Sequence, residues 1–96
     1  MLYNPHTRLC SRESILYYLD TKDPKGRYSW TNPVSCACGQ YINDVCNYVT
    51  THNWGPYIDN PNILALNKLA MPPNNGAWGT WGDLRDKVIL RKDLFI

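Results

Sequence analysis

Apolar side chains recur at helical spacing in four segments of the chain, and clusters of Pro, Gly and Asn separate these segments. In the first segment, residues 12–19, Ile15 and Leu19 share one face, and Ser11 is a suitable N-cap. The second segment, residues 35–49, has an apolar face with the i, i+4, i+7, i+8, i+11 spacing of a half-buried helix. That face consists of Cys38, Ile42, Val45, Cys46 and Val49.

Start signals predict two further helices. Asn60 followed by Pro61 combines a capping residue with one suited to the first helical position, and Pro72 ends the segment. Thr80 and Asp83 have the spacing of a capping box. The apolar faces that follow carry Ile63 and Leu66 in the third helix, and Trp81, Leu84 and Val88 in the fourth.

Residue types that suit strands occur in GRYSW and in KVILRKDLFI. We therefore expect a mainly α fold, a compact domain of three to four short helices with Pro/Gly/Asn-rich loops and room for a minor β-hairpin (α+β). Residues 1–96 are short enough for one globular domain. The predicted core consists of Ile15, Leu19, Cys38, Ile42, Val45, Val49, Ile63, Leu66, Leu84 and Val88.

Charge and hydropathy narrow the class of protein. Ten Lys and Arg residues against eight Asp and Glu residues leave a net charge of +2, too weak to indicate nucleic acid by itself. No apolar run is long enough to span a membrane, and MLYNPHTRLCSRES lacks the apolar core of a signal peptide. We expect a cytoplasmic protein with reduced thiols and no membrane partner.

The stretch NPVSCACGQYINDVCNYV holds three of the four cysteines and raises the question of a metal site. Zinc sites usually bring paired C-x₂₋₄-C ligands together, whereas Cys36 and Cys38 form C-x-C. On a helix, Cys38 and Cys46 lie about 12 Å apart along the axis. We therefore expect no bound metal, and the absence of nucleotide-binding glycine motifs predicts no cofactor.

Cys36 leaves one catalytic alternative open. If Ser35 caps the second helix, Cys36 is the first helical residue, where the helix dipole lowers a thiol pKa. His6 or His52 then serves as a base, which makes the chain a cysteine-dependent enzyme or a redox protein. Small buried thiols on a helix face explain the same residues without catalysis, so we expect a protein that is not an enzyme.

Aromatic residues punctuated by Gly and Pro are the most distinctive feature outside the cysteine segment. NWGPYID and GAWGTWGD contain Trp54, Tyr57, Trp78 and Trp81, with Arg85 following. These rings either close the core or anchor a partner protein, since Trp, Tyr and Arg are typical of interface hot spots. Predicted binding residues are therefore Trp54, Tyr57, Trp78, Trp81 and Arg85. Weak nucleic-acid binding is a further alternative, although acidic residues interrupt the basic ones near the C-terminus.

The order of SRESILYYLD, YSWTNPVS, CACGQYI and TWGDLRDKVI resembles small accessory proteins of bacteriophages and prophages in which a Cys-Ala-x-Gly motif opens a core helix. The resemblance implies a viral protein acting in the host bacterial cytoplasm. It implies a protein partner, with the chain as an inhibitor of a host or anti-phage defence factor. It supplies no catalytic residues.

The cysteine analysis predicts that purified protein carries far less than one zinc ion per chain and that a chelator leaves it folded. Elemental analysis of the protein, with a thermal melt before and after chelation, measures both. Stoichiometric zinc would contradict a helix through Cys38 and Cys46, because one tetrahedral ion cannot bind both thiolates across that distance.

Overall fold

A computed structural model of the chain describes residues 10–30, 36–47, 54–71 and 78–96. In chain order the elements are α2 (Arg12–Asp20), β1 (Arg27–Ser29), α3 (Ala37–Cys46), η1 (Gly55–Tyr57), α4 (Pro61–Ala70), β2 (Trp78–Thr80), α5 (Trp81–Leu90) and η3 (Lys92–Leu94). The predicted fold class, mainly α with a minor antiparallel hairpin, is confirmed. In the described part of the chain, each helix is too short or too polar to traverse a lipid bilayer.

Three helices begin at the residues that the sequence predicts. Ser11 Oγ accepts the Ser14 amide at 3.1 Å at the start of α2. Asn60 Oδ1 accepts the second and third amides of α4 at 2.9 and 3.2 Å. Thr80 Oγ1 accepts the Asp83 amide at 3.4 Å at the start of α5. Each cap satisfies amides that lack a partner within the helix.

The second predicted helix, residues 35–49, is shorter than expected at both ends. Cys36 is the N-cap rather than the first helical residue, and its sulfur accepts the Gly39 amide at 3.4 Å. The helix stops at Cys46 because Asn47 adopts the left-handed conformation, with φ of 54°. Asn can adopt this conformation at low cost, so Asn47, which lies inside the predicted helix, is instead its stop.

The cap considered at Ser35 lies outside the described residues, as does Val49 of the predicted core. Val45 is only half-buried, close to the end of α3. All the other predicted core residues are buried, which confirms the apolar faces of the four helices. The buried set also includes Tyr18, Tyr28 and Tyr41, so aromatic side chains fill much of the interior.

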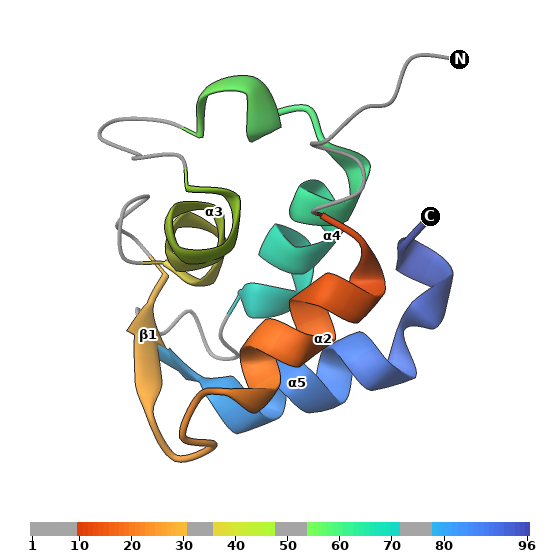
Figure 1. Ribbon diagram of the computed structural model, residues 1–96. Coiled ribbons are helices and arrows are strands. Elements are labelled where there is room, and N and C mark those ends of the chain that lie inside the picture. The colour runs from red at the N-terminus through yellow and green to blue at the C-terminus, as the bar shows by residue number, and fades with distance from the viewer. Residues whose placement is uncertain (1–9, 31–35, 48–53, 72–77) are drawn as a thin grey trace.

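Helices α2 and α5 lie side by side and run antiparallel (Figure 1). At one end, Arg12 donates to the carbonyls of Val88 at 3.4 Å and Ile89 at 3.2 Å. At the other end, Arg85 pairs with Asp20. Helix α4 packs on both α5 and α3, and the two-stranded sheet lies where α5 begins. Because α2 and α5 run antiparallel, the end of α2 and the start of α5 lie together at one corner of the domain.

The hairpin pairs Tyr28 with Gly79 and Ser29 with Trp78. A Cβ added at Gly79 would lie 2.5 Å from the Tyr28 ring, so only glycine allows this approach. The Tyr28 hydroxyl donates to the carbonyl of Ala70 at 2.7 Å, which fixes the ring over Gly79. Strand formation at Arg27–Ser29 confirms the prediction for GRYSW. KVILRKDLFI, which also has residue types that suit a strand, is instead helical, since it continues α5 and forms η3.

Asn62 is the one buried polar residue among those described, and it joins three parts of the chain. Its Nδ2 donates to the Cys10 carbonyl at 2.8 Å, and its Oδ1 accepts the Ile96 amide at 2.9 Å. A buried side-chain amide destabilises the fold unless its polar atoms have hydrogen-bond partners. Both the nitrogen and the oxygen of the Asn62 amide have one. Asn62 therefore ties Cys10, the residue before the N-cap of α2, and Ile96 to α4.

Asn62→Ala should lower the free energy of unfolding by about 2 kcal/mol, because it leaves the Cys10 carbonyl without its buried donor. Denaturant unfolding of this variant measures the loss. Asn67→Ala, a half-buried position on the same helix, serves as the matched control and should change stability by less than about 1 kcal/mol. Equal losses of unfolding free energy for the two variants would show that the Asn62 hydrogen bonds do not anchor Cys10 and Ile96 to α4.

Candidate functional site

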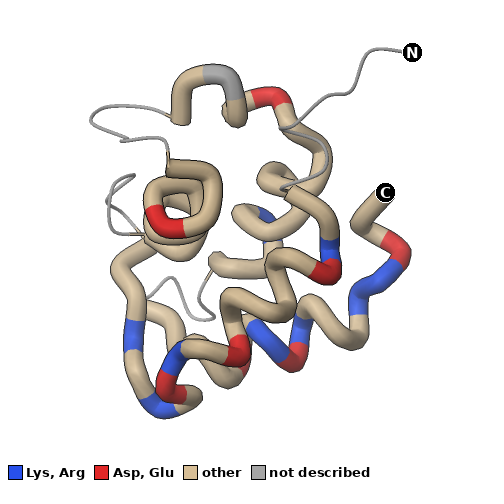
Figure 2. Tube along the Cα trace, in the orientation of Figure 1, with Lys and Arg blue, Asp and Glu red and all other residues tan. Residues whose placement is uncertain are grey.

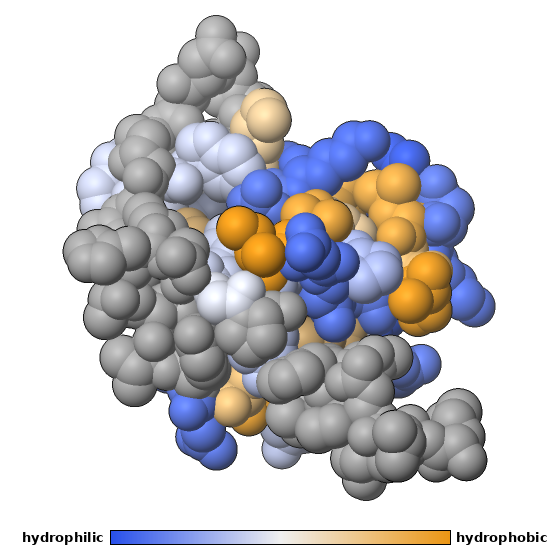
Figure 3. All heavy atoms as spheres, turned by 90° about the horizontal axis from the view of Figure 1, so that it is seen from above, coloured by the Kyte–Doolittle hydropathy of each residue, from blue (hydrophilic) through white to orange (hydrophobic). Residues whose placement is uncertain are grey.

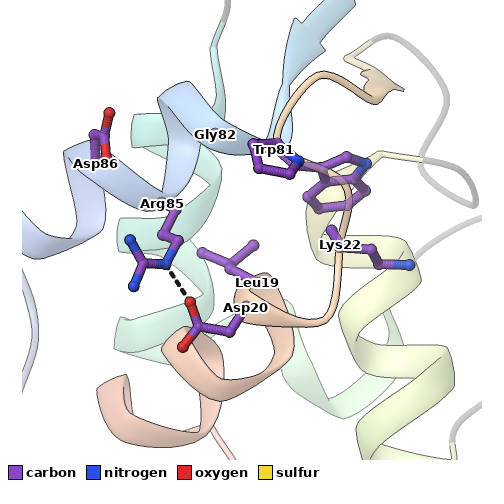
Figure 4. Close-up of a pocket in the computed structure, with 8 residues that line it drawn as sticks. Leu19, Asp20, Lys22, Trp81, Gly82, Arg85 and Asp86 are labelled. Carbon is purple, nitrogen blue, oxygen red and sulfur yellow. Dashed lines mark hydrogen bonds and ion pairs between the residues drawn. The ribbon is translucent and has the colours of Figure 1, made fainter.

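A pocket of about 320 Å³ lies where the end of α2 and the following loop meet the start of α5 (Figure 4). Its lining residues are Leu19, Asp20, Lys22, Pro24, Trp81, Gly82, Arg85 and Asp86. Apolar and charged groups therefore share one small surface, and two of the predicted site residues, Trp81 and Arg85, lie in it together.

The indole of Trp81 forms the buried wall of the pocket and is only 5% exposed. Its ring centroid lies 4.9 Å from that of Tyr28 and 6.3 Å from that of Tyr18, the latter edge to face. Lys22 Nζ lies 5.1 Å from the indole centroid and 4.8 Å from the Tyr18 centroid. The ring thus contacts α2, β1 and the loop between them, so it holds these three segments together in the core.

The cations of the pocket already have anionic neighbours. Arg85 pairs with Asp20 across the α2–α5 contact, and both side chains are about half exposed. Lys22 Nζ lies 4.0 Å from Asp44 on α3, in addition to its position over the rings. Asp44 also accepts a hydrogen bond from Tyr18 at 2.5 Å, and burial first, then this bond, raises the tyrosine pKa. Exposed pairs of this kind contribute at most about 1 kcal/mol each, so a ligand can compete for them.

The amides at the start of α5 have partners within the chain. The Trp81 amide donates to the Gly26 carbonyl at 3.0 Å, and the Gly82 amide donates to the Pro24 carbonyl at 3.0 Å. A Cβ at Gly82 would lie 2.9 Å from that Pro24 oxygen, so the close packing of loop and helix requires glycine. Free amides at a helix start are what hold an anion, and these are occupied by the loop. The pocket consequently suits a side chain or a short peptide segment better than a phosphate.

Trp78 has the opposite environment to Trp81. Alternation along β2 directs Gly79 toward the buried Tyr28 ring, so Trp78 lies on the outer face of the hairpin. Its side chain is 57% exposed, and the Arg27 guanidinium carbon lies 5.7 Å from the indole centroid. Strand pairing and this stacking hold a large apolar ring in solvent. The outer face of the hairpin therefore presents an aromatic group beside a cation.

The predicted binding residues fall into different environments. Tyr57 in η1 is 2% exposed, and Trp81 is buried, so both rings belong to the core. Trp54 is half-buried against the core, and its indole N–H donates to the Cys36 sulfur. Only Trp78 presents most of its ring to solvent, while Arg85 is half-buried in the pocket. The four rings therefore do not form one exposed surface. Trp78 alone among them is mostly exposed, and Arg85 lies in the pocket.

Two further residues complete the site and escaped the sequence analysis. They are Lys22, in the loop after α2, and Arg27, in β1. Arg27 faces the same side as Trp78 only because β1 and β2 pair antiparallel with Ser29 opposite Trp78. The strand-forming segment GRYSW was a usable signal for β1, but its pairing with a glycine-rich segment some fifty positions later had none.

Cys36 lacks the properties of a nucleophile. It is 3% exposed, its sulfur caps α3, and burial raises its pKa despite hydrogen bonds from nearby amides and Trp54. A reactive cysteine instead needs access and a stabilised thiolate. The proposed bases, His6 and His52, lie outside the described residues. Within the described residues, no three potential metal ligands cluster together.

The contrast between the two rings predicts different effects of truncation on folding. Trp81→Ala should reduce the free energy of unfolding by about 3–5 kcal/mol, because it empties a buried site between α2, β1 and α5. Trp78→Ala, three residues earlier, should cost less than about 1 kcal/mol, since the ring is mostly in water. Chemical denaturation of both variants measures the difference. Similar losses would mean that the two rings are equally buried.

The assignment of this site rests on its geometry alone. Comparison of the chain with protein families, curated proteins and solved structures finds no match.

Proposed function

We propose that the protein is a non-enzymatic binding module that recognises another protein. Its contact surface is the outer face of the β1–β2 hairpin, with Trp78 and Arg27, and the adjoining pocket at the start of α5. The observation that carries the proposal is the indole of Trp78, which is 57% exposed although its backbone is fixed in a strand.

An exposed tryptophan on a strand is well suited to anchor a partner. The ring offers a large apolar area that gains free energy when a partner removes it from water. Strand pairing and the nearby Arg27 guanidinium limit its freedom before binding, so less conformational entropy is lost in the complex. Trp and Arg are also the residue types most often found at hot spots.

The pocket provides a second place, beside the Trp78 anchor, where side chains of the partner can bind. It begins at Trp81, three positions after Trp78, and contains the half-exposed pair of Asp20 and Arg85. A partner side chain of either charge can replace one member of this pair, and Leu19 with the edge of Trp81 supplies apolar contact. Figure 3 shows a different face of the domain, on which the described apolar residues form small groups among hydrophilic ones.

Two alternatives receive less support. Acidic and basic residues alternate along α2, the following loop and α5, so no continuous basic track for nucleic acid is present among the described residues (Figure 2). Enzymatic use of Cys36 conflicts with its burial and its role as a helix cap. The identity of the partner as a host or anti-phage defence factor, inhibited by a phage-encoded protein, rests on the resemblance of the sequence alone.

The proposal is tested by quantitative capture from a bacterial lysate with immobilised wild-type protein and single variants. Trp78→Ala should abolish retention of a specific protein, and with that protein purified its affinity should fall about thirtyfold or more, which is about 2 kcal/mol. Arg27→Ala should weaken the same partner to a smaller degree. Thermal melts of each variant establish that the fold is kept.

Leu90→Ala is the matched control, because Leu90 is 78% exposed on α5 and lies outside the proposed surface. It should retain the partner at the wild-type level. A partner lost equally with Leu90→Ala and Trp78→Ala would place the interface elsewhere, as would a partner unaffected by both Trp78→Ala and Arg27→Ala.

A further inference from the structure

The outer edge of β1 carries backbone groups that the sheet does not use. The Trp81 amide donates to the Gly26 carbonyl at 3.0 Å, and these two residues continue the register of the strands. Bonded and non-bonded pairs alternate along an antiparallel ladder, so Tyr28 bonds to β2, whereas Arg27 and Ser29 turn their amides and carbonyls away from it. No donor or acceptor in the described part of the chain bonds to these four groups.

This edge is accessible from solvent. In Figure 1, β1 lies at the margin of the domain, with β2 on its inner side. Arg27 is exposed and Ser29 is half-buried, while Tyr28 between them is buried because its ring points inward. The outer edge of β2 offers less, because the chain passes from Thr80 directly into α5. An incoming chain can therefore approach β1 along its free side.

The chemistry of the edge specifies what fits it. Amides and carbonyls that recur every second residue on one side of a strand match the acceptors and donors of another extended backbone. The sheet has only two strands of three residues each, and a third can join it without breaking a hydrogen bond of the fold. In strand addition of this kind, the backbone supplies affinity and alternate side chains supply specificity.

Charge beside the edge favours an acidic segment. Arg27 stacks on Trp78 and has no carboxylate partner among the described residues. Lys25 lies two positions before it and adds a second positive charge. Asp23, in the same turn, accepts the Lys25 amide at 3.0 Å, so its carboxylate is already engaged there. An acidic side chain opposite Arg27 would complement this charge.

Ser29 leaves the exposed indole within reach of an added strand. Ser29 lies directly opposite Trp78, and alternation places both on the outer face together with Arg27. Because the serine side chain is small, an apolar side chain opposite it can extend across the strand toward the indole, which is largely exposed. Acidic and apolar residues two positions apart would thus contact Arg27 and Trp78 at the same time.

We propose that β1 binds an extended segment of the partner protein as a third strand of the sheet, and that this segment has an acidic residue two positions from an apolar one. The inference rests on the proposed function, since it names the part of a protein partner that the surface recognises. A second copy of the chain fits the edge less well, because pairing β1 with itself would bring like charges of Arg27 and Lys25 together.

Hydrogen exchange of single amides, followed by NMR, tests the edge with a defined probe. The probe is a synthetic peptide with the sequence most enriched when phage-displayed random peptides are selected on the full-length protein. In the free protein, the Arg27 and Ser29 amides should exchange fast and the Tyr28 amide slowly. Saturating peptide should slow the first two by at least about tenfold, while Tyr28 stays slow in both states. The enriched sequences should share an acidic residue two positions from an apolar one.

Three results would overturn the proposal. The first is that no peptide is enriched, and the second is a bound peptide that leaves exchange at Arg27 and Ser29 unchanged. The third is protection of these amides that rises with protein concentration in the absence of peptide, which would assign the edge to a second copy of the chain.

A matched pair of variants isolates the backbone contribution. Ser29→Pro removes one outward amide and should lower peptide affinity by about tenfold, whereas Ser29→Ala keeps that amide and should bind like the wild type. Proline is tolerated on an edge strand when its nitrogen faces away from the neighbouring strand, and a thermal melt checks the fold. Arg27→Glu should change the selected charge from acidic to basic. Equal affinities for Ser29→Pro and Ser29→Ala would contradict strand addition.

N-methylation of the peptide gives the same answer without altering the protein. Methylation of the alternate amides that pair with β1 should abolish binding, and methylation of the amides between them should be tolerated, whereas equal effects of the two patterns would contradict the proposal. The outcomes also separate this inference from the proposed function. A lysate partner that is lost with Trp78→Ala but fully retained by folded Ser29→Pro would leave the binding surface in place and refute the added strand. A peptide that protects Arg27 and Ser29, with capture unaffected by Trp78→Ala and Arg27→Ala, would do the reverse.

Discussion

The burial of Trp81 at the first position of α5 is the constraint on which the arrangement of this domain depends. Its indole contacts Tyr18 of α2 and Tyr28 of β1, and its amide bonds to the loop between them. One side chain therefore sets the position of the hairpin relative to the α2–α5 pair. Loss of this contact would separate the two strands from the helices, because the sheet has only two short strands of its own.

The same constraint produces the proposed binding surface. With Trp81 fixed inside and Gly79 pressed against Tyr28, alternation along β2 leaves Trp78 on the outside. Arg27 reaches Trp78 through the antiparallel pairing that Tyr28 and Gly79 maintain. A pocket opens where the loop that covers Trp81 meets α5. The buried ring and the exposed ring are thus two results of one packing arrangement, and this relation explains why neighbouring tryptophans serve different purposes.

Local signals in the sequence were enough to predict the helices. Caps at Ser11, Asn60 and Thr80 depend on side chains that bond to amides two or three residues away, so their consequences stay within a short segment. The apolar faces likewise identified most of the core. The end of α3 at Asn47 was missed, because a left-handed residue breaks the helix while the apolar spacing continues beyond it.

Contacts between distant segments could not be predicted in the same way. Burial of Tyr57 and Trp81, but not Trp78, depends on which elements pack together, and Trp–Gly patterns look alike in either case. The same reason hid Asn62, whose partners Cys10 and Ile96 lie far away in the chain. Cys36 attracted attention by its place in a motif, whereas the fold buries its sulfur as the N-cap of α3.

Fluorine NMR of protein labelled with fluorotryptophan, in the presence of a soluble paramagnetic agent, tests the contrast between the two rings most directly. Trp→Phe variants assign the four resonances. The Trp78 signal should broaden strongly, and the Trp81 signal should remain sharp, because the exposed fractions of the two side chains are 57% and 5%. Equal broadening of both signals, or a protected Trp78 beside an accessible Trp81, would contradict the packing on which the binding surface rests.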